Sequence, residues 1–345
     1  MEGVSIVCAA QQYVKLVDGK TLAITSHGEL KSKREIERLC TVPTSSAWNA
    51  SAVAGEPQMA AALRDGAVEV WSAQQSGADA RVCARFQSAP GPVVGFGTVG
   101  SAGSLLTCAQ SGEVRVWAPP AARGAAPTLS ASFTVPGPLA AMRIEPTARA
   151  DVACGGKTRD LTVWSIEQEK AIFAAENQPD DWLDMPVPNW ITDLCFVSPL
   201  ASSSSSGASA GAVAAAAPAA SSACAHLIVT VTSHRQIRLY DCRAQRKPVK
   251  FYDDIAGGDG QNAYALRLVA PAPDGASVFV SDTTGGLYRR SLSTGKLMAS
   301  YKGVQGSLRS LDIAPDACVG FLFYRYIASC SQFDSLPLTY LTRRA

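Results

Sequence analysis

A short pattern that ends in tryptophan recurs along the chain at nearly constant spacing. It is found as "DGAVEVWS" (65–72), "SGEVRVWA" (111–118) and "TRDLTVWS" (158–165), and the three tryptophans stand 46 and 47 residues apart. In each copy a turn precedes alternating apolar and polar residues, which is the pattern of a half-buried β-strand. The chain is therefore expected to consist of copies of one β-rich unit, each with a marker residue near the end of a strand.

Three weaker copies extend this repeat in both directions. They carry Val17, Tyr240 and Arg290 at the marker position, in "QQYVKLVD" (11–18), "HRQIRLYD" (234–241) and "TGGLYRRS" (284–291). Apolar runs such as "LLTCA" and "LIVTV" stand before the markers from Trp71 onward and predict the preceding strand of each hairpin. A seventh copy is expected within residues 307–341.

The spacing breaks once, between Trp164 and Tyr240, which stand 76 residues apart. This interval contains "ASSSSSGASAGAVAAAAPAASSA" (201–223), whose composition cannot bury enough apolar area to order itself. Without those 23 residues the interval shortens to 53 and the period is restored. We expect residues 201–223 to be a disordered low-complexity loop within a single domain that spans residues 1–345.

A period of this size, with four short strands in each unit, is typical of a WD-repeat-type β-propeller. The predicted fold is all-β, with seven blades of four-stranded antiparallel sheet. The last blade is disturbed, because "ACVGFLFYRYIASCSQFDSLPLTYLTRRA" (317–345) lacks a clear marker hairpin. Since a propeller closes by pairing its first and last strands, either the chain is cut short or its last blade closes differently.

The composition of the chain limits which functions and which cellular compartments are expected. Lys and Arg together number 31 and Asp and Glu 29, so the formal net charge of +2 gives no general case for nucleic-acid binding. The ten cysteines are widely spaced and are expected to be reduced core residues of a cytosolic or nuclear protein. The N-terminus does not resemble a signal peptide, and the most apolar run, residues 211–220, is too short to span a membrane.

Catalysis has little support in the sequence. The three histidines His27, His226 and His234 are not joined to any HExxH, paired-cysteine or serine-elbow motif. We therefore expect a protein that is not an enzyme, with no catalytic, metal or cofactor site and no small-molecule substrate.

Two glycine-containing motifs resemble phosphate-binding loops only in part. "GFGTVG" (95–100) matches G-x-G-x-x-G, but a strand and not a helix follows it, so it is expected to be a hairpin turn. "GGKTRD" (155–160) lacks the first glycine of a P-loop and leads into Trp164, so it is expected to be a turn of a blade. Its outward-pointing Lys157 and Arg159 are either solvated or contacts for a partner.

Other basic residues also allow two interpretations. Arg115 and Arg238 each stand two residues before a marker and are expected to be structural. "RAQRKPVK" (243–250) forms a local basic cluster with Arg235. That cluster either contacts RNA phosphate or is an ordinary solvated loop.

The segment "NQPDDWLDMPVPNW" (177–190) fits neither a helical nor a strand period and is long for a connection between blades. Exposed tryptophan beside acids and prolines is costly unless it packs on something. Trp182 and Trp190 therefore either pack on the neighbouring blades of the chain or form a docking element on one face of the propeller.

Residues 155–197 resemble the nucleolar WD-repeat family that assembles the large ribosomal subunit. Members carry a G-G-K turn, a strand that ends in Trp-Asp, and a segment like N-D-W-L-D-L-R-V-P-x-W, which is matched here by Asp181, Trp182, Leu183, Asp184, Val187, Pro188 and Trp190. A K-G-x-x-G-S-x-R pattern is matched by Lys302, Gly303, Gly306, Ser307 and Arg309. The chain departs from the family at Glu176, Pro186 and Ile191, which weakens any expectation that the segment binds phosphate.

The resemblance implies a non-catalytic assembly factor in the nucleus and nucleolus. Its partners would be pre-ribosomal assembly factors, the AAA-type ATPase that releases the protein, precursor rRNA and RNA-decay machinery. The alternative is a WD-repeat adaptor of another pathway, such as the substrate receptor of a ubiquitin ligase. The expected partner-binding residues are Lys157, Arg159, Asp181, Trp182, Asp184, Trp190, Arg235, Lys302 and Arg309.

Overall fold

The computed structural model describes residues 5–9, 14–18, 24–27, 36–42, 48, 58–72, 81–100, 102–120, 125–180, 183–197, 226–253, 255, 264–301, 308–313 and 320–324. Every regular element in these ranges is a β-strand, and the strands form seven antiparallel sheets. The loop predicted at residues 201–223 lies outside the described residues. No helix long and apolar enough to cross a bilayer occurs in the described ranges.

The sheets follow one another in chain order. The first contains β1 (Ser5–Ala9), β2 (Val14–Asp18) and β3 (Ile24–His27), and the second β4 (Ile36–Val42), β5 (Gln58–Leu63), β6 (Ala67–Ser72) and β7 (Arg81–Gln87). The third contains β8 (Val93–Val99), β9 (Ser104–Ala109), β10 (Glu113–Ala118) and β11 (Thr128–Thr134), and the fourth β12 (Ala141–Ile144), β13 (Asp151–Gly156), β14 (Arg159–Ser165) and β15 (Lys170–Ala174).

The remaining three sheets complete the series. The fifth contains β16 (Ile191–Val197), β17 (Leu227–Thr232), β18 (Ile237–Asp241) and β19 (Lys250–Tyr252), and the sixth β20 (Leu266–Pro271), β21 (Ser277–Asp282), β22 (Leu287–Ser291) and β23 (Leu297–Tyr301). The seventh contains β24 (Leu308–Ile313) and β25 (Gly320–Tyr324). Five sheets therefore have the expected four strands, while in the described residues the first has three and the last two.

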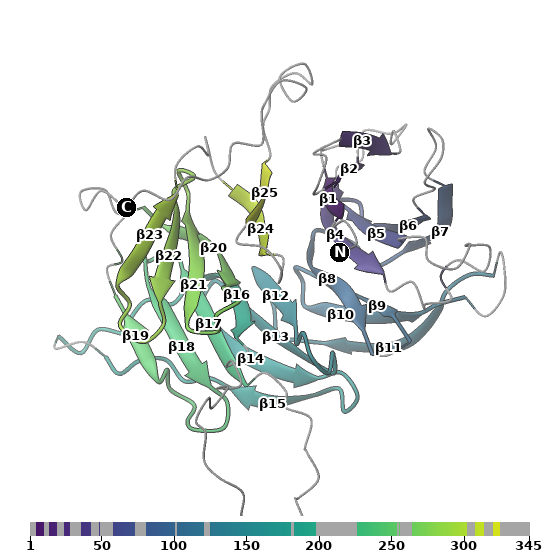
Figure 1. Ribbon diagram of the computed structural model, residues 1–345. Coiled ribbons are helices and arrows are strands. Elements are labelled where there is room, and N and C mark those ends of the chain that lie inside the picture. Colours follow the sequence, from purple (N-terminus) through teal and green to yellow (C-terminus); the bar gives the residue numbers. More distant parts are fainter. Residues whose placement is uncertain are drawn as a thin grey trace, which may run out of the picture.

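The seven sheets are arranged as the blades of a β-propeller (Figure 1). The first strand of each four-stranded sheet contacts the first strand of the next sheet, from β4 through β8, β12, β16 and β20 to β24. These strands are therefore the inner strands of the ring. The ring returns on itself, because β1 contacts β25.

The repeat marker occupies the same place in every blade that carries one. Each marker is the residue before the last of its strand, at Val17 in β2, Trp71 in β6, Trp117 in β10, Trp164 in β14, Tyr240 in β18 and Arg290 in β22. The indole rings fill the space between blades: Trp117 packs on Phe86 of the preceding sheet, with ring centroids 4.7 Å apart, and Trp164 on Phe133, at 5.9 Å. The period of the sequence is therefore the period of blade packing.

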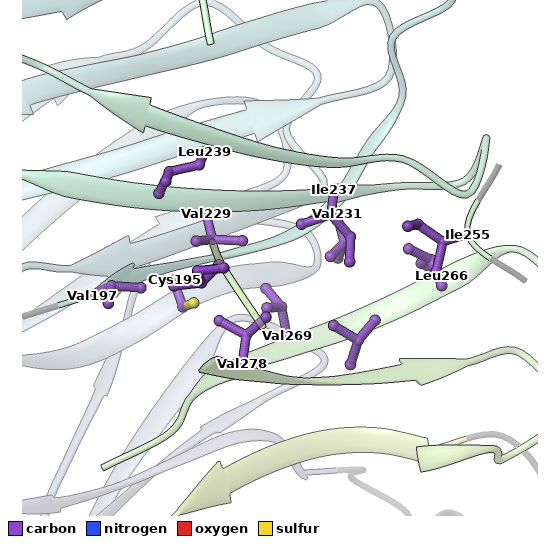
Figure 2. Packing of buried hydrophobic residues seen from close by; sticks show 12 residues of the cluster. Cys195, Val197, Val229, Val231, Ile237, Leu239, Ile255, Leu266, Val269 and Val278 are labelled. Carbon is purple, nitrogen blue, oxygen red and sulfur yellow. The ribbon is translucent and has the colours of Figure 1, made fainter. Parts of the chain in front are cut away.

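The core lies between neighbouring sheets. Figure 2 shows one such layer, in which Cys195, Val229 and Ile237 of the fifth sheet pack against Leu266, Val269 and Val278 of the sixth sheet. Both faces of these sheets are buried, which explains the nearly continuous apolar runs of β17 and β21. Cys108, Cys154 and Cys195 are buried free thiols, as predicted for core cysteines.

The interpretation of "GFGTVG" as a turn is wrong for most of its length. Residues 95–99 lie inside β8, and the turn begins only at Gly100. A Cβ atom on Gly95 would lie 2.6–2.9 Å from three atoms of the Met142 side chain of the next blade. The glycine is needed because β8 and β12 approach closely, not because the chain reverses there.

Two kinds of loop share one face of the ring, which we call the connection face. They are the connections from the fourth strand of one sheet to the first strand of the next, and the turns between second and third strands. Hydrogen bonds join the two kinds: Ser88 N donates to Gly66 O at 2.8 Å, and Val135 N to Gly112 O at 2.8 Å. The residues on this face come from all around the ring and are therefore brought together by the fold.

Candidate docking surface

The segment 177–190 is the connection from β15 to β16, and its own side chains close its base. Asn177 Nδ2 donates to Val187 O at 2.7 Å, and Asn177 Oδ1 accepts from Gln178 N at 2.9 Å. One asparagine near the start of the segment thus binds the backbone near its end. The extra residues form a closed loop on the connection face and not an open linker.

Arg238 of β18 holds this loop from below. Its side chain is fully buried, and its Nη1 donates to Asn177 Oδ1 at 2.8 Å while its Nη2 donates to Pro188 O at 3.1 Å. Nη2 also donates to Gln236 Oε1 at 2.7 Å, and the guanidinium lies 5.4 Å from the Phe251 ring centre. The expectation that Arg238 is structural is correct, and the structure adds that it anchors a loop of the preceding connection.

The end of the loop is tied to the turns of two blades. Thr158 N of the β13–β14 turn donates to Asn189 O at 3.1 Å, and Asn189 Nδ2 donates to Asp160 Oδ1. On the other side, Ser233 N of the β17–β18 turn donates to Trp190 O at 2.9 Å. The loop is therefore fixed to the fourth and fifth sheets before it enters β16.

The outward side of this loop presents large apolar side chains. Leu183 is 58% exposed, Met185 59% and Trp190 37%. Asp184 between the first two has a φ of 55°, a backbone conformation that aspartate tolerates better than most residues. We call Leu183, Met185 and Trp190 the apolar ridge.

Lys157 connects the ridge to the turn predicted from "GGKTRD". Its Nζ lies 4.6 Å from the centre of the Trp190 ring, and the two residues also form an isolated antiparallel β-bridge. An ammonium group above an indole face is attracted by the ring quadrupole, so the exposed indole is held in one orientation. The turn is shorter than the predicted residues 155–160, because Gly155 and Gly156 end β13 and Arg159 and Asp160 begin β14. Only Lys157 and Thr158 lie between the strands, and Lys157 and Arg159 are exposed.

The structure brings together part of the predicted site. Lys157, Asp184, Trp190 and Arg235 lie in turns or connections of the connection face, and Arg159 is the first residue of β14, next to one of these turns. Arg159 Nε donates to Gly137 O at 3.2 Å, and Arg235, with a φ of 64°, lies in the β17–β18 turn. Asp181, Trp182 and Lys302 lie outside the described residues. Arg309 is described only as the second residue of β24, and its side chain is outside the description.

The predicted basic cluster is not one cluster. Arg235 precedes β18 and residues 243–250 follow it, so the two parts lie at opposite ends of that strand. Arg246 belongs instead to the neighbouring blade, where its Nε donates to Ala174 O at 2.8 Å and its Nη1 lies 3.2 Å from Glu176 Oε1. Lys250 Nζ donates to Ser293 O at 3.0 Å. Nearness in sequence was a poor guide because β18 separates the two parts.

Sequence reasoning missed several residues of this surface. Leu183 was matched to the family pattern but not recognised as exposed, and Met185, Asn177 and Asn189 were not singled out. A usable signal was present, because asparagines near both ends of a proline-rich segment are suited to binding backbone groups. In the described residues, no group of three or more His, Cys, Asp or Glu side chains could hold a metal ion.

Comparison with known proteins places this surface in context. No family model matches the chain. It is 30% identical over 297 residues to WD repeat-containing protein 74 of Bos taurus, an alignment that covers 84% of this chain and 64% of that protein. The chain is thus a β-propeller that is similar in sequence to WD repeat-containing protein 74.

Further relatives agree with this assignment. The human protein of the same name is 29% identical over 294 residues, again with 84% of this chain and 64% of the relative covered. Ribosome biogenesis protein nsa1 of Schizosaccharomyces pombe is 24% identical over 191 residues, which is 51% of this chain and 45% of that protein. The chain thus spans 64% of the length of the mammalian relatives.

Proposed function

We propose that this chain is a non-catalytic assembly factor in the biogenesis of the large ribosomal subunit. The fungal relatives are named ribosome biogenesis proteins, and the mammalian relatives align with most of this chain. A rigid ring with several loops on one face suits a protein that positions partners. In this role the chain binds partners and catalyses no reaction.

The main support for the proposed docking role is the apolar ridge, which stands on a loop whose backbone is held in place. Large apolar side chains at a protein surface are most informative when they cluster and when their backbone is held in place. Leu183, Met185 and Trp190 belong to one exposed loop, and buried Arg238 and the two flanking turns hold the backbone of that loop in place. An ordered apolar anchor loses little conformational entropy when a partner covers it.

Finer parts of the proposal rest on the resemblance of residues 155–197 to the assembly-factor family. We propose that the protein works in the nucleolus on early pre-ribosomal particles and is removed from them by an AAA-type ATPase. Contacts with precursor rRNA and with RNA-decay machinery belong to the same proposal. The residues proposed for these contacts are Lys157, Arg159, Asp181, Trp182, Asp184, Trp190, Arg235, Lys302 and Arg309.

Affinity purification of the tagged protein from nuclear extract tests this function. Large-subunit assembly factors, precursor rRNA and an AAA ATPase should co-purify with the unaltered chain. A variant with Leu183→Ser, Met185→Ser and Trp190→Ala should lose most of these partners, since buried apolar anchors dominate the affinity of many interfaces.

A matched control separates loss of docking from general surface damage. Leu129→Ser with Ile172→Ser removes two side chains that are 48% and 51% exposed on the outer strands β11 and β15, and it should leave the purification unchanged. Thermal melting must show that both variants fold. Recovery of ubiquitin-ligase subunits or signalling proteins in place of ribosomal factors would refute the assembly function. Equal loss of partners in the two variants would refute the docking role of the apolar ridge.

A further inference from the structure

Charged side chains gather where the inner strands begin. Near the start of these strands a one-residue bulge recurs in five sheets, at Glu37 in β4, Val94 in β8, Thr192 in β16, Arg267 in β20 and Arg309 in β24. A bulge redirects the side chains around it, and its recurrence gives the five strands the same local geometry. Figure 1 shows these strands side by side around the middle of the ring.

Five charged residues at this level form what we call the axial cluster. They are Glu37 and Arg38 of β4, Arg143 of β12, Asp193 of β16 and Arg267 of β20. All lie within the first three residues of their strands, so they face the connection face. Asp193 is the third residue of β16, and Trp190 of the apolar ridge immediately precedes that strand.

The cluster joins neighbouring blades. Arg143 Nη2 donates to Asp193 Oδ2 at 2.9 Å and its Nε to Leu194 O at 3.2 Å, so β12 is tied to β16. Asp193 Oδ2 also accepts from Val269 N of β20 at 3.1 Å. On the other side of the ring, Arg38 Nε donates to Val94 O at 3.4 Å, and Glu37 Oε2 accepts from Val93 N at 2.7 Å.

Among the five residues of the axial cluster, positive charges outnumber negative charges by one. In the part of the chain that the structure describes, the cluster holds three guanidiniums and two carboxylates, and each carboxylate also accepts a backbone N–H. Burial and the like charge of Arg143 lower the pKa of Arg38, whereas the carboxylates of Asp193 and Glu37 raise it. With a smaller lowering by Arg267, the net effect is a lowered pKa. The arginines remain accessible: Arg143 has 36% of its side chain exposed, and Arg38 and Arg267 are partly exposed.

We propose that the axial cluster binds carboxylate side chains of an acidic peptide segment from a protein partner. A guanidinium and a carboxylate match each other in shape and can form two parallel hydrogen bonds. Such pairs are most favourable when the arginines are already fixed and partly desolvated, as Arg38 and Arg143 are here. An acidic side chain would meet the excess charge of three arginines held by three different sheets.

The charges around the cluster favour a peptide over RNA. Asp180 and Asp184 lie exposed on the loop that carries the ridge, and Asp160 and Glu176 lie beside its two ends. A nucleic-acid backbone carries a charge on every residue and would be repelled along this path. A peptide with a few acids can place its carboxylates on the arginines and its apolar side chains on the ridge.

The proposal concerns the same face as the docking role but does not depend on ribosome assembly, since it is tested with the purified chain alone. The probe is a fluorescein-labelled peptide that carries two glutamates and two leucines in an otherwise glycine–serine sequence, and binding is followed by fluorescence anisotropy at low salt. The double variant Arg38→Gln with Arg267→Gln should weaken binding about tenfold. Binding to the unaltered chain should also weaken as salt is added.

The variants are chosen to keep the fold. Arg143 is left in place because its removal would leave buried Asp193 without its ion pair. Lys170→Gln with Lys296→Gln removes the same number of positive charges from the opposite edges of the fourth and sixth sheets, and it should change the affinity less than twofold. If the axial variant melts much earlier than the unaltered chain, the single Arg38→Gln and Arg267→Gln variants replace it, each with an expected loss of about threefold.

Three results would overturn the proposal. The first is no binding of the peptide by the unaltered chain. The second is equal loss in the axial and control variants, which would show attraction by overall charge. The third is tighter binding of labelled oligouridine than of the peptide, with the same dependence on Arg38 and Arg267, which would identify the cluster as an RNA site. Failure of any of these tests leaves the co-purification of ribosomal factors as a separate question.

Discussion

Arg238 Nη1 lies 2.8 Å from Asn177 Oδ1, so a fully buried guanidinium of the fifth sheet holds the first residue of the loop that leaves the fourth. The same guanidinium reaches Pro188 O near the other end of that loop. A single side chain therefore fixes both ends of the segment that carries the apolar ridge. Loop position and blade packing are coupled through this residue.

Replacement of Arg238 by methionine should destabilise the protein by about 3 kcal/mol, because it removes charged hydrogen bonds, leaves Pro188 O without this donor and leaves Asn177 Oδ1 only the bond from Gln178 N. The midpoint of urea unfolding measures the loss. Arg115→Met is the matched control, since Arg115 also stands two residues before its marker but pairs with Glu113 where both side chains are partly exposed. Its cost should be below about 1 kcal/mol.

Hydrogen exchange gives a second readout of the same anchor. In Arg238→Met the amides of Thr158 and Ser233, which donate to the loop, should exchange faster than in the unaltered chain. The amide of Ser88, which donates to Gly66 in the second sheet, should be unaffected. Equal stability of the two methionine variants, or uniform changes in exchange, would contradict the anchoring role.

The close approach of β8 and β12 predicts unequal effects of two similar substitutions. Gly95→Ala should cost about 1–3 kcal/mol, because its Cβ would meet three atoms of Met142 at 2.6–2.9 Å. Gly97→Ala meets only the tip of Ile144 below 3 Å, at 2.8 Å, and a flexible tip can shift at lower cost. Chemical unfolding of both variants measures the difference.

A rescue variant makes this test sharper. Met142→Ala removes the atoms that the new methyl group would meet, so adding it to Gly95→Ala should cost less than the sum of the two single changes. Strict additivity would show that the loss in Gly95→Ala comes from the backbone of β8 and not from crowding against Met142.

Much of the fold could be predicted because its signal is local. In most sheets, the alternation of apolar and polar residues and the marker residue identify one strand from the sequence. The marker falls at the same place in β2, β6, β10, β14, β18 and β22. "GFGTVG" misled because glycine marks both a reversal of the chain and a close approach of two strands. Only the position of Met142 in the next blade distinguishes the two.

The candidate docking surface was harder to predict from the sequence than the fold, for a physical reason. Its parts are joined by contacts across blades: Arg238 with Asn177, Lys157 with Trp190, and Arg143 with Asp193. The inner-strand positions of the axial cluster hold Glu, Arg and Asp in different blades, so no repeated letter marks them. The segment 177–190 stood out by composition, but which of its side chains face outward depends on how its base is tied.

Asp274 in the β20–β21 turn should make stability depend on acid. Burial acts to raise its pKa, but hydrogen bonds from Ser277 and Arg289 act the other way and the net effect is a lowered pKa. A lowered pKa in the folded state adds stability above the pKa of the unfolded chain, near 4, and this stability is lost as the pH falls through the folded value.

Asp274→Asn should therefore cost about 1 kcal/mol at pH 7, a modest value because about a third of both the Asp274 and Arg289 side chains is exposed. The difference between the variant and the unaltered chain should shrink as the pH is lowered below about 4. Urea unfolding at several pH values measures it. A difference that stays constant down to pH 3 would show that the hydrogen bonds do not favour the ionised form.

The buried thiols predict an alkaline limit to stability. Burial raises the pKa of Cys108 to about 12, and it also raises the pKa of Cys154, which lies in the same core cluster. A thiol whose pKa is raised in the folded state adds stability that is fully present below the unfolded value, near 8.5, and is lost as the pH rises toward the folded value. Stability should therefore fall between about pH 9 and 12, and less steeply in Cys108→Ala.

Alkylation tests the same state of the thiols directly. Because the thiolate is the reactive form, iodoacetamide at pH 8 should leave Cys108 and Cys154 unmodified in the folded chain and should modify both in urea. Mass spectrometry of the digested protein locates the label, and partly exposed Cys83 serves as the internal reference. Rapid native labelling of Cys108 would show that the layer between the third and fourth sheets opens, and the alkaline dependence would then need another source.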